Sequence, residues 1–92
     1  MAEFAGRWRR VDGVAYETLD DEAVLLNLNV GTYYRLNAVA ARAWSVLETP
    51  RKLEEIAAEL LPIFEVDEDT LHSDLRALLR DMRQSGLVLE EP

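Results

Sequence analysis

The chain has 92 residues, a formal net charge of −8 and no cysteine. A chain of this length buries only about two-thirds of its surface on folding, so we expect residues 1–92 to form a single domain with one hydrophobic core. The absence of cysteine excludes disulfides, thiolate nucleophiles and cysteine-based metal centres. The acidic charge argues against a nucleic-acid partner. No apolar run reaches membrane-spanning length, so we expect a cytoplasmic protein that does not enter a membrane.

The N-terminal third of the chain has the pattern of a small β-sheet. Residues 1–12 carry the basic and aromatic segment RWRR, which we expect to be an N-terminal tail or an edge segment. From residue 14 to residue 36, apolar or β-branched side chains fall on alternate positions, and this period predicts three short strands. These positions are Val14, Tyr16, Thr18, Val24, Leu26, Leu28, Thr32, Tyr34 and Leu36. An acidic run at residues 20–22 separates the first two strands, and Gly31 supplies the positive φ of a tight turn before the third, so we predict an antiparallel arrangement.

Two adjacent tyrosines in the third predicted strand must point in opposite directions. Neighbouring residues of a strand face opposite sides of the sheet. If Tyr34 packs inward with Leu36, Tyr33 and Arg35 point outward. One tyrosine is then part of the core, and the other is available for contact with a partner.

After residue 36 the apolar residues follow the period of a helix. Asn37 can cap a first helix that ends near Glu48, before Thr49 and Pro50. An apolar stripe over residues 53–61 predicts a second, short helix that Pro62 ends. The third helix begins after its cap Asp67 and ends at Gly86. Its core face consists of Leu71, Leu75, Leu78, Leu79 and Met82.

The third helix also has an uneven distribution of charge. At 100° per residue, Asp67, Asp74 and Asp81 recur along one flank of the apolar face. The arginines at positions 76, 80 and 83 lie toward the far side. This distribution has two interpretations: a solvated surface of mixed charge, or an acidic rim on a groove whose floor is formed by Leu71, Leu75 and Leu78.

The chain offers few groups for catalysis or for holding a cofactor. His72 is the only histidine, so no usual zinc site can be assembled. The three serines lie in helical patterns, outside any nucleophile elbow. The acidic run that begins at Asp67 lacks the oxygen ligand and the glycine that a calcium loop needs, because Leu71 and His72 stand there. We therefore expect a protein without enzymatic activity, cofactor or metal.

Two stretches of the sequence resemble the PqqD-like family of peptide-recognition domains. One is VLLNLNVGTYYRLN at residues 24–37, which continues as AARAW at residues 40–44, and the other is DLRALL at residues 74–79, followed by SGLV at residues 85–88. The similarity extends over residues 13–89. Before the first helix, the chain departs from PqqD itself, in which this segment resembles LL-x-P-E. The chain is more similar to the free-standing leader-binding proteins of lasso-peptide pathways.

This resemblance implies an α+β domain in which a three-stranded antiparallel sheet precedes three helices in a winged-helix-like arrangement. It also implies a non-catalytic recognition element, which binds the leader of a ribosomally made precursor peptide and delivers it to a maturation enzyme, here a lasso-peptide leader peptidase. In the family, the leader adds as a strand to the third strand and lies toward the third helix. Carried over to this sequence, the peptide-binding residues are Thr32, Tyr33, Tyr34, Arg35, Leu36, Asp67, Leu71, Asp74, Leu75 and Leu78.

Other functions are still open at the level of sequence. A winged-helix DNA-binding protein has the same kinds of element, but its recognition helix would carry more acidic residues than arginines. A PqqD-type peptide chaperone for a radical-SAM enzyme is a second alternative. A small assembly subunit that pairs through the same edge strand is a third, so we expect a monomer or a weak homodimer.

Overall fold

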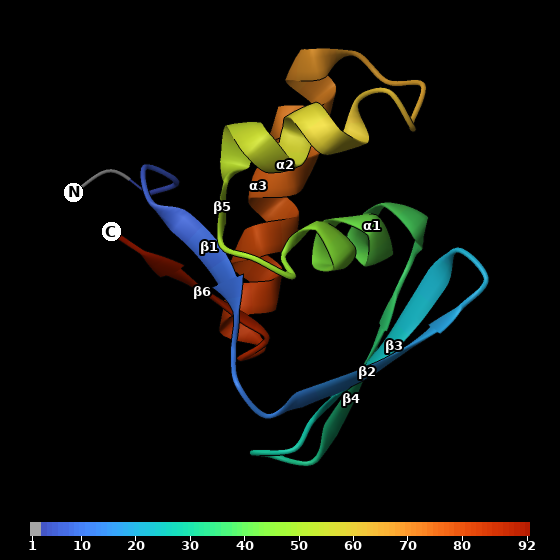
Figure 1. The fold of residues 1–92 in the computed structure, drawn as a ribbon, viewed down its shortest axis with the longest axis vertical. Coiled ribbons are helices and arrows are strands. Elements are labelled where there is room, and N and C mark those ends of the chain that lie inside the picture. Colours follow the sequence, from blue (N-terminus) through green and yellow to red (C-terminus); the bar gives the residue numbers. More distant parts are fainter. Residues whose placement is uncertain (1–2) are drawn as a thin grey trace.

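The computed structural model describes residues 3–92, which form three helices and two three-stranded sheets (Figure 1). In chain order the elements are β1 (Arg7–Arg10), β2 (Val14–Leu19), β3 (Glu22–Asn27), β4 (Thr32–Leu36), α1 (Ala38–Val46), β5 (Arg51–Lys52), α2 (Leu53–Leu60), α3 (Glu68–Gln84) and β6 (Val88–Glu91). No helix in this part of the chain is both long and apolar enough to cross a membrane.

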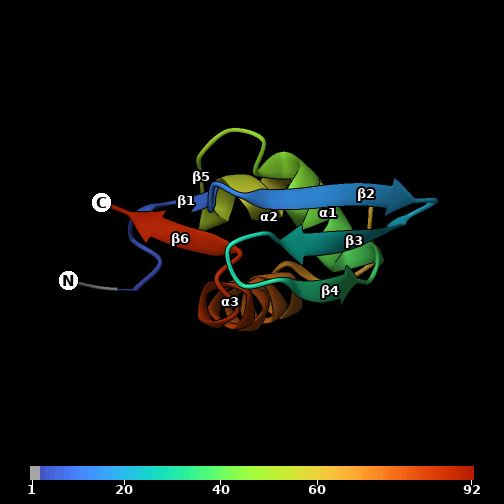
Figure 2. The same cartoon turned by 90° about the horizontal axis from the view of Figure 1, so that it is seen from below.

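The first sheet has the strand order β2-β3-β4 with antiparallel pairing, as the sequence predicted. All three helices lie on one side of it, which leaves its other face uncovered by helices (Figures 1 and 2). The face of β3 that points toward the helices carries Ala23 and Leu25, both fully buried. Val24 and Leu26, which contributed to the alternating pattern in the sequence, lie on the uncovered face and are half-buried.

The second sheet, with the order β5-β1-β6, is absent from the sequence-based prediction. Residues 7–10 were expected to be a tail or an edge segment, but they form its central strand and place the fully buried Trp8 in the core. Arg7 and Arg9 are paired with Glu55 and Glu91 at 3.4 Å and 2.9 Å. The basic segment is therefore part of the fold.

The helices begin and end where the sequence predicted, within a few residues. The side chain of Asn37 accepts a hydrogen bond from the N–H of Ala40 at 3.0 Å, and Asp67 accepts one from the N–H of Thr70 at 2.8 Å. Each bond satisfies one of the free N–H groups of a first helical turn. Gly86, with a φ of 75°, follows the end of α3. The structure confirms the α+β fold class, a meander followed by three helices.

Asn27 is the one buried polar residue among those described, and it joins two distant segments. Its side-chain Nδ2 donates a hydrogen bond to the carbonyl oxygen of Gly86 at 3.2 Å, and its Oδ1 accepts one from the N–H of Asn29 at 2.9 Å. Its main-chain oxygen accepts a third from the N–H of Gly31 at 2.7 Å. This residue therefore shapes the β3–β4 turn and connects it to the junction of α3 and β6.

We expect Asn27→Ala to lower the free energy of unfolding by about 1–3 kcal/mol, because the substitution removes two part-buried hydrogen bonds that connect the β3–β4 turn to Gly86. Thermal or chemical denaturation followed by circular dichroism measures the change. Asn29→Ala is the matched control, since Asn29 is exposed and its side chain donates to the oxygen of Asp12 at 3.1 Å. Equal stability losses in the two variants would contradict the role assigned to Asn27.

Candidate functional site

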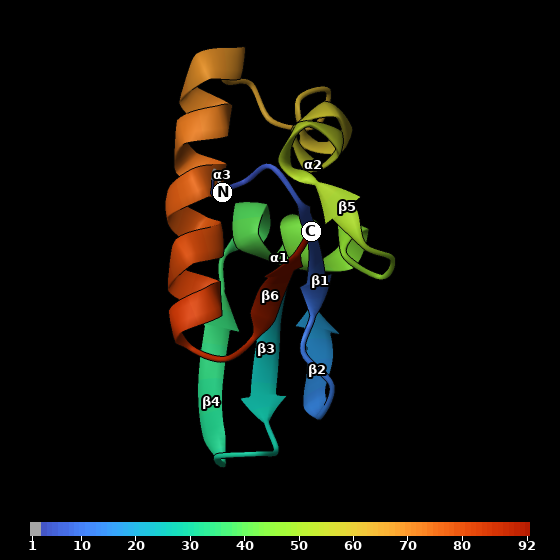
Figure 3. The ribbon, with the colours of Figure 1, turned by 90° about the vertical axis from the view of Figure 1, so that its left-hand side faces the viewer.

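Strand β4 lies at one edge of the first sheet. Within residues 3–92 it pairs with β3 on one side, and no strand pairs with its other side. Figure 3 shows β4 at the edge of the sheet, on the same side of the molecule as α3. An edge strand presents backbone N–H and C=O groups in fixed geometry, to which an extended peptide can bind.

The hydrogen bonds of the neighbouring strands determine which backbone groups of β4 point outward. The N–H of Leu28 donates to the oxygen of Gly13 next to β2, whereas the oxygen of Asn27 accepts from Gly31 on the β4 side. Sides alternate along an antiparallel strand, so Asn27 and Leu25 face β4 and form hydrogen-bonded pairs with Thr32 and Tyr34. The backbone groups of Tyr33 and Arg35 therefore point away from the sheet.

The side chains of β4 take the orientations that the sequence predicted. Tyr33 is 70% exposed on the uncovered face, and Arg35 on the same face contacts Glu22 at 2.9 Å. Tyr34 is half-buried on the opposite face, where Leu36 is buried. The exposed Tyr33 is thus available for contact, whereas the half-buried Tyr34 packs against the core.

A hydrogen bond connects β4 to the C-terminal end of α3. The hydroxyl of Tyr34 donates to the main-chain oxygen of Ser85 at 3.1 Å. At 100° per residue, Asp74, Leu78 and Asp81 lie within about 40° of Ser85 around the helix axis. Leu78 is half-buried, and both aspartates are exposed. Toward the C-terminal end of α3, the flank on the side of β4 therefore carries one half-buried apolar side chain and two exposed acidic side chains.

The same flank continues toward the N-terminal end of α3, where Leu71 and Asp67 also lie within about 40° of Ser85 around the helix axis. Leu71 and Leu75 are buried in the core. Both carboxylate oxygens of Asp67 accept hydrogen bonds from Thr70, and the Thr70 N–H holds the pKa of Asp67 below its usual value. Asp67 and Ser85 flank opposite ends of α3, about 27 Å apart at a rise of ~1.5 Å per residue. A peptide that runs along α3 therefore needs about eight extended residues, at ~3.3 Å each, to pass from the level of Ser85 to that of Asp67.

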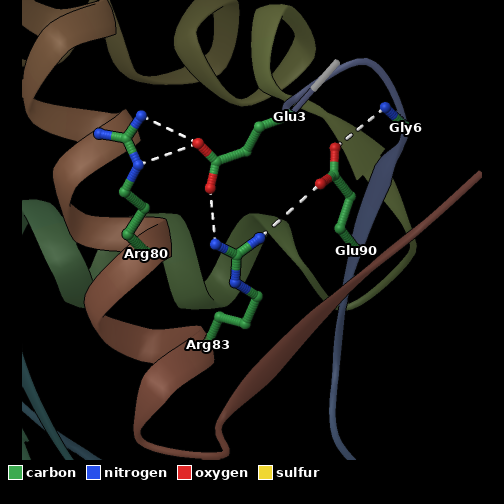
Figure 4. Close-up of polar contacts among 5 residues, drawn as sticks. All are labelled: Glu3, Gly6, Arg80, Arg83 and Glu90. Carbon is green, nitrogen blue, oxygen red and sulfur yellow. Dashed lines mark hydrogen bonds and ion pairs between the residues drawn. The ribbon is translucent and has the colours of Figure 1, made fainter. Parts of the chain in front are cut away.

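The N-terminal segment contacts two arginines, Arg80 and Arg83, on the other flank of α3 (Figure 4). One carboxylate oxygen of Glu3 accepts hydrogen bonds from Arg80, the shorter at 2.9 Å, and the other accepts one from Arg83 at 2.6 Å. Arg83 also lies 3.9 Å from Glu90, whose carboxylate accepts a hydrogen bond from the N–H of Gly6. These contacts separate the two flanks of α3: one is engaged within the fold, and the other lies toward the free edge of β4.

The titratable side chains show no arrangement typical of a catalytic centre. The ring of His72 lies 3.9 Å from Glu68 on the same helix. In the described part of the chain, no group of three or more histidine, aspartate or glutamate side chains could hold a metal ion. The geometry of this region instead suits the binding of an extended peptide, with backbone groups on one side and an apolar and acidic helix flank on the other.

Three residues that hold β4 and α3 in place were not predicted from the sequence. Asn27 and Ser85 position β4 relative to α3, and Glu3 binds two arginines of α3. The Ser85 contact is made by its backbone, so its residue type gives no signal. The bonds of Asn27 to Gly86 and of Glu3 to α3 join residues far apart in sequence, where local periodicity carries no information.

The sequence and the fold are similar to those of known proteins. Residues 22–88 match the family described as Coenzyme PQQ synthesis protein D (PqqD). A solved structure described as "TbiB1 in Complex with the TbiA(beta) Leader Peptide" is 40% identical, with a TM-score of 0.78 over 86% of this chain and 93% of that chain. Another, described as "Lasso peptide synthetase B1 complexed with the leader peptide", is 26% identical, with a TM-score of 0.77 over 89% and 96%. Among curated proteins, none matches the chain.

The contacts of Glu3 should make the stability of the fold depend on pH. Hydrogen bonds from Arg80 and Arg83 hold the pKa of Glu3 below its usual value of 4.5. A carboxylate with a lowered pKa stabilises the folded state above its unfolded pKa, and this contribution disappears as the pH falls through the folded pKa. We therefore expect Glu3→Gln to lower the melting temperature at pH 7, and we expect the difference from the unsubstituted protein to shrink below pH 4.5.

Thermal unfolding from pH 7 down to pH 3 measures this difference. Glu59→Gln, which removes an exposed carboxylate on α2, is the control and should give a smaller difference at pH 7. A Glu3→Gln effect that stays constant through the acidic range would contradict the assignment.

Proposed function

This chain belongs to the PqqD family, as its sequence predicted, and we propose that it is a non-catalytic recognition element that binds the leader segment of a ribosomally made precursor peptide. The observation that carries the proposal is the free edge of β4, with the backbone groups of Tyr33 and Arg35 pointing outward beside α3. The two similar solved structures support it, because each is described as a complex with a leader peptide and matches most of this chain.

In this proposal the leader adds to β4 as a further antiparallel strand. Tyr33 and Arg35 each offer one donor and one acceptor. Such bonds contribute about 0.5–1.5 kcal/mol each, while ordering each peptide residue costs about 1–2 kcal/mol, so backbone pairing alone gives little affinity. Apolar leader side chains that become buried contribute about 1.5–3 kcal/mol each. Leu78 and Tyr34, both half-buried, are positioned to receive them, so side chains decide affinity and backbone pairing sets register.

We further propose that the partner that takes the bound leader is a lasso-peptide leader peptidase. The similarity to a lasso peptide synthetase B1 supports this class of partner. A PqqD-type chaperone for a radical-SAM enzyme is the alternative within the same family. The winged-helix DNA-binding alternative receives no support from the charges, since Arg7, Arg9 and Arg80 are each paired with a carboxylate.

Calorimetric titration of the purified protein with a synthetic leader, taken from the precursor encoded beside its gene, tests the function directly. We expect saturable binding, with the mass of the peptide unchanged after incubation. The absence of binding, or chemical change of the peptide by this protein alone, would overturn the proposal.

Tyr33→Pro tests the binding edge. Proline removes an N–H that points outward and blocks the close approach of a partner strand, but it removes no hydrogen bond to β3. We expect the variant to melt within a few degrees of the unsubstituted protein and to lose at least tenfold in affinity for the leader. Calorimetry measures the affinity, and circular dichroism measures the melting temperature.

Two controls separate the backbone effect from other losses. Tyr33→Ala removes the same side chain and keeps the N–H, so it should bind more tightly than Tyr33→Pro. Thr32→Pro removes an N–H that faces β3, so it should destabilise the fold. If Tyr33→Pro folds and binds normally, the leader does not add to β4.

Asp74→Asn tests the acidic flank. If Asp74 faces a basic residue of the leader, the substitution weakens binding and flattens its dependence on salt, because exposed charge pairs are screened over about 8 Å at physiological ionic strength. Calorimetry at several salt concentrations measures both effects. Asp69→Asn is the matched control, since Asp69 lies on the other side of the same helix and should have little effect. Identical results for the two variants would favour a merely solvated surface.

A further inference from the structure

A second surface of the protein has an unusual composition. We use the name outer face for the face of the β2-β3-β4 sheet that points away from the helices (Figure 2). It contains a shallow depression of about 200 Å³. The residues that line it are Ala15, Tyr16, Glu17, Val24, Leu26 and Tyr33. The adjoining β3–β4 turn exposes Leu28 and Val30, at 63% and 67%.

An antiparallel sheet with one solvated face normally alternates apolar residues inward with polar residues outward. Here the centre of the outward side is apolar, formed by Ala15, Val24 and Leu26. Charged residues flank Val24 in its row, with Glu17 on one side and Arg35 on the other, and Arg35 is paired with Glu22 at 2.9 Å. Together with the exposed Tyr33, Leu28 and Val30, the residues at the centre form an apolar surface of the kind through which proteins contact other molecules.

The outer face is continuous with the proposed leader site. Tyr33 belongs to both, because its backbone lies on the free edge and its side chain lines the depression. A strand added to β4 places every second side chain on the same side of the sheet as Tyr33. The bound leader would therefore widen the outer face by one strand.

Size and charge distinguish between the molecules that could cover this surface. Strand spacing and length give the three-stranded face an area of about 300 Å², well below the ~800 Å² per partner of a standard stable interface. A partner that covers this face must therefore also contact something beside it, such as the bound leader. A second copy would also bring another net charge of −8. The acidic groups near the face, Glu17, Asp20 and Asp21, favour a partner with basic side chains around an apolar contact.

We propose that the outer face is the docking surface of the maturation enzyme, which contacts the sheet and the bound leader together through an apolar patch bordered by basic side chains. This inference rests on the proposed function, because it assumes that the leader pairs with β4. The consequence is coupling: the enzyme binds the leader-loaded domain more tightly than the free domain.

The test uses substitutions on the outer face that avoid the leader site. Leu26→Lys places a charge at the centre of the outer face. Ala15→Lys adds the same charge on β2, at an exposed position of this face that tolerates a long side chain. Ser73→Lys is the matched control, since it adds the same charge at an exposed position of α3. The probe is the purified leader peptidase encoded beside the precursor. The measurements are its affinity for each variant, with and without leader, and the rate of precursor cleavage.

We expect both outer-face variants to bind the leader with an affinity within about twofold of that of the unsubstituted protein. Their affinity for the peptidase should fall at least tenfold, and precursor cleavage should slow. Ser73→Lys should leave peptidase binding and cleavage unchanged. Unchanged peptidase binding and cleavage in a folded Ala15→Lys variant would overturn the inference and leave the proposed function intact. Loss of leader binding in both variants would overturn it too, because the outer face would then belong to the leader site.

Two further outcomes are distinguishable. If the unsubstituted protein binds no leader, the proposed function fails first, and this inference fails with it. If sedimentation shows a dimer that the outer-face variants abolish, the face is an interface between two copies, and docking of the enzyme there is overturned.

Discussion

The hydrogen bond from the buried side chain of Asn27 to the oxygen of Gly86 is the contact on which the arrangement of the site depends. Asn27 ends β3, and Gly86 follows α3, so this bond ties the sheet to the helix. The fit there is close, because a Cβ added to Gly86 would lie 3.1 Å from the Asn27 side-chain nitrogen. The Tyr34 hydroxyl reaches Ser85, the residue next to Gly86. Two polar contacts at one end of α3 therefore position the edge strand beside the helix.

The second sheet explains why only one flank of α3 lies open toward the edge strand. Its central strand buries Trp8, and Arg83 lies over this ring at 5.5 Å, while Arg80 lies 5.1 Å from the Phe4 ring. Glu3 forms ion pairs with both arginines. Arg80 and Arg83 are thus engaged within the fold, and the flank that carries Asp74 and Leu78 lies toward β4. The exposed surface of α3, for which the sequence allowed a simple surface of mixed charge, therefore has two flanks with different roles.

The sequence predicted the features that depend on neighbouring residues: three strands, two capped helices and the opposite orientations of Tyr33 and Tyr34. It failed where the signal is not local. Strands β1 and β6 have four residues each, are largely charged and pair across almost the whole chain, so neither has a period of its own. The helix face was also ambiguous, since buried core positions such as Leu75 and half-buried ones such as Leu78 obey the same spacing. Only the packing of the other elements separates them.

A protein that binds a peptide by strand addition must leave an edge strand unprotected, and unprotected edges also pair with copies of themselves. The usual protections are proline, a bulge or a charged side chain in the edge strand, and the one charged residue in the sequence TYYRL of β4 is Arg35, which is paired with Glu22. Adding a proline or a bulge would block the leader as well. The net charge of −8 offers a different protection, because it opposes association of two copies and leaves the backbone of β4 free. The same charge favours leaders and partners that carry basic residues, so solubility and selectivity have one physical origin.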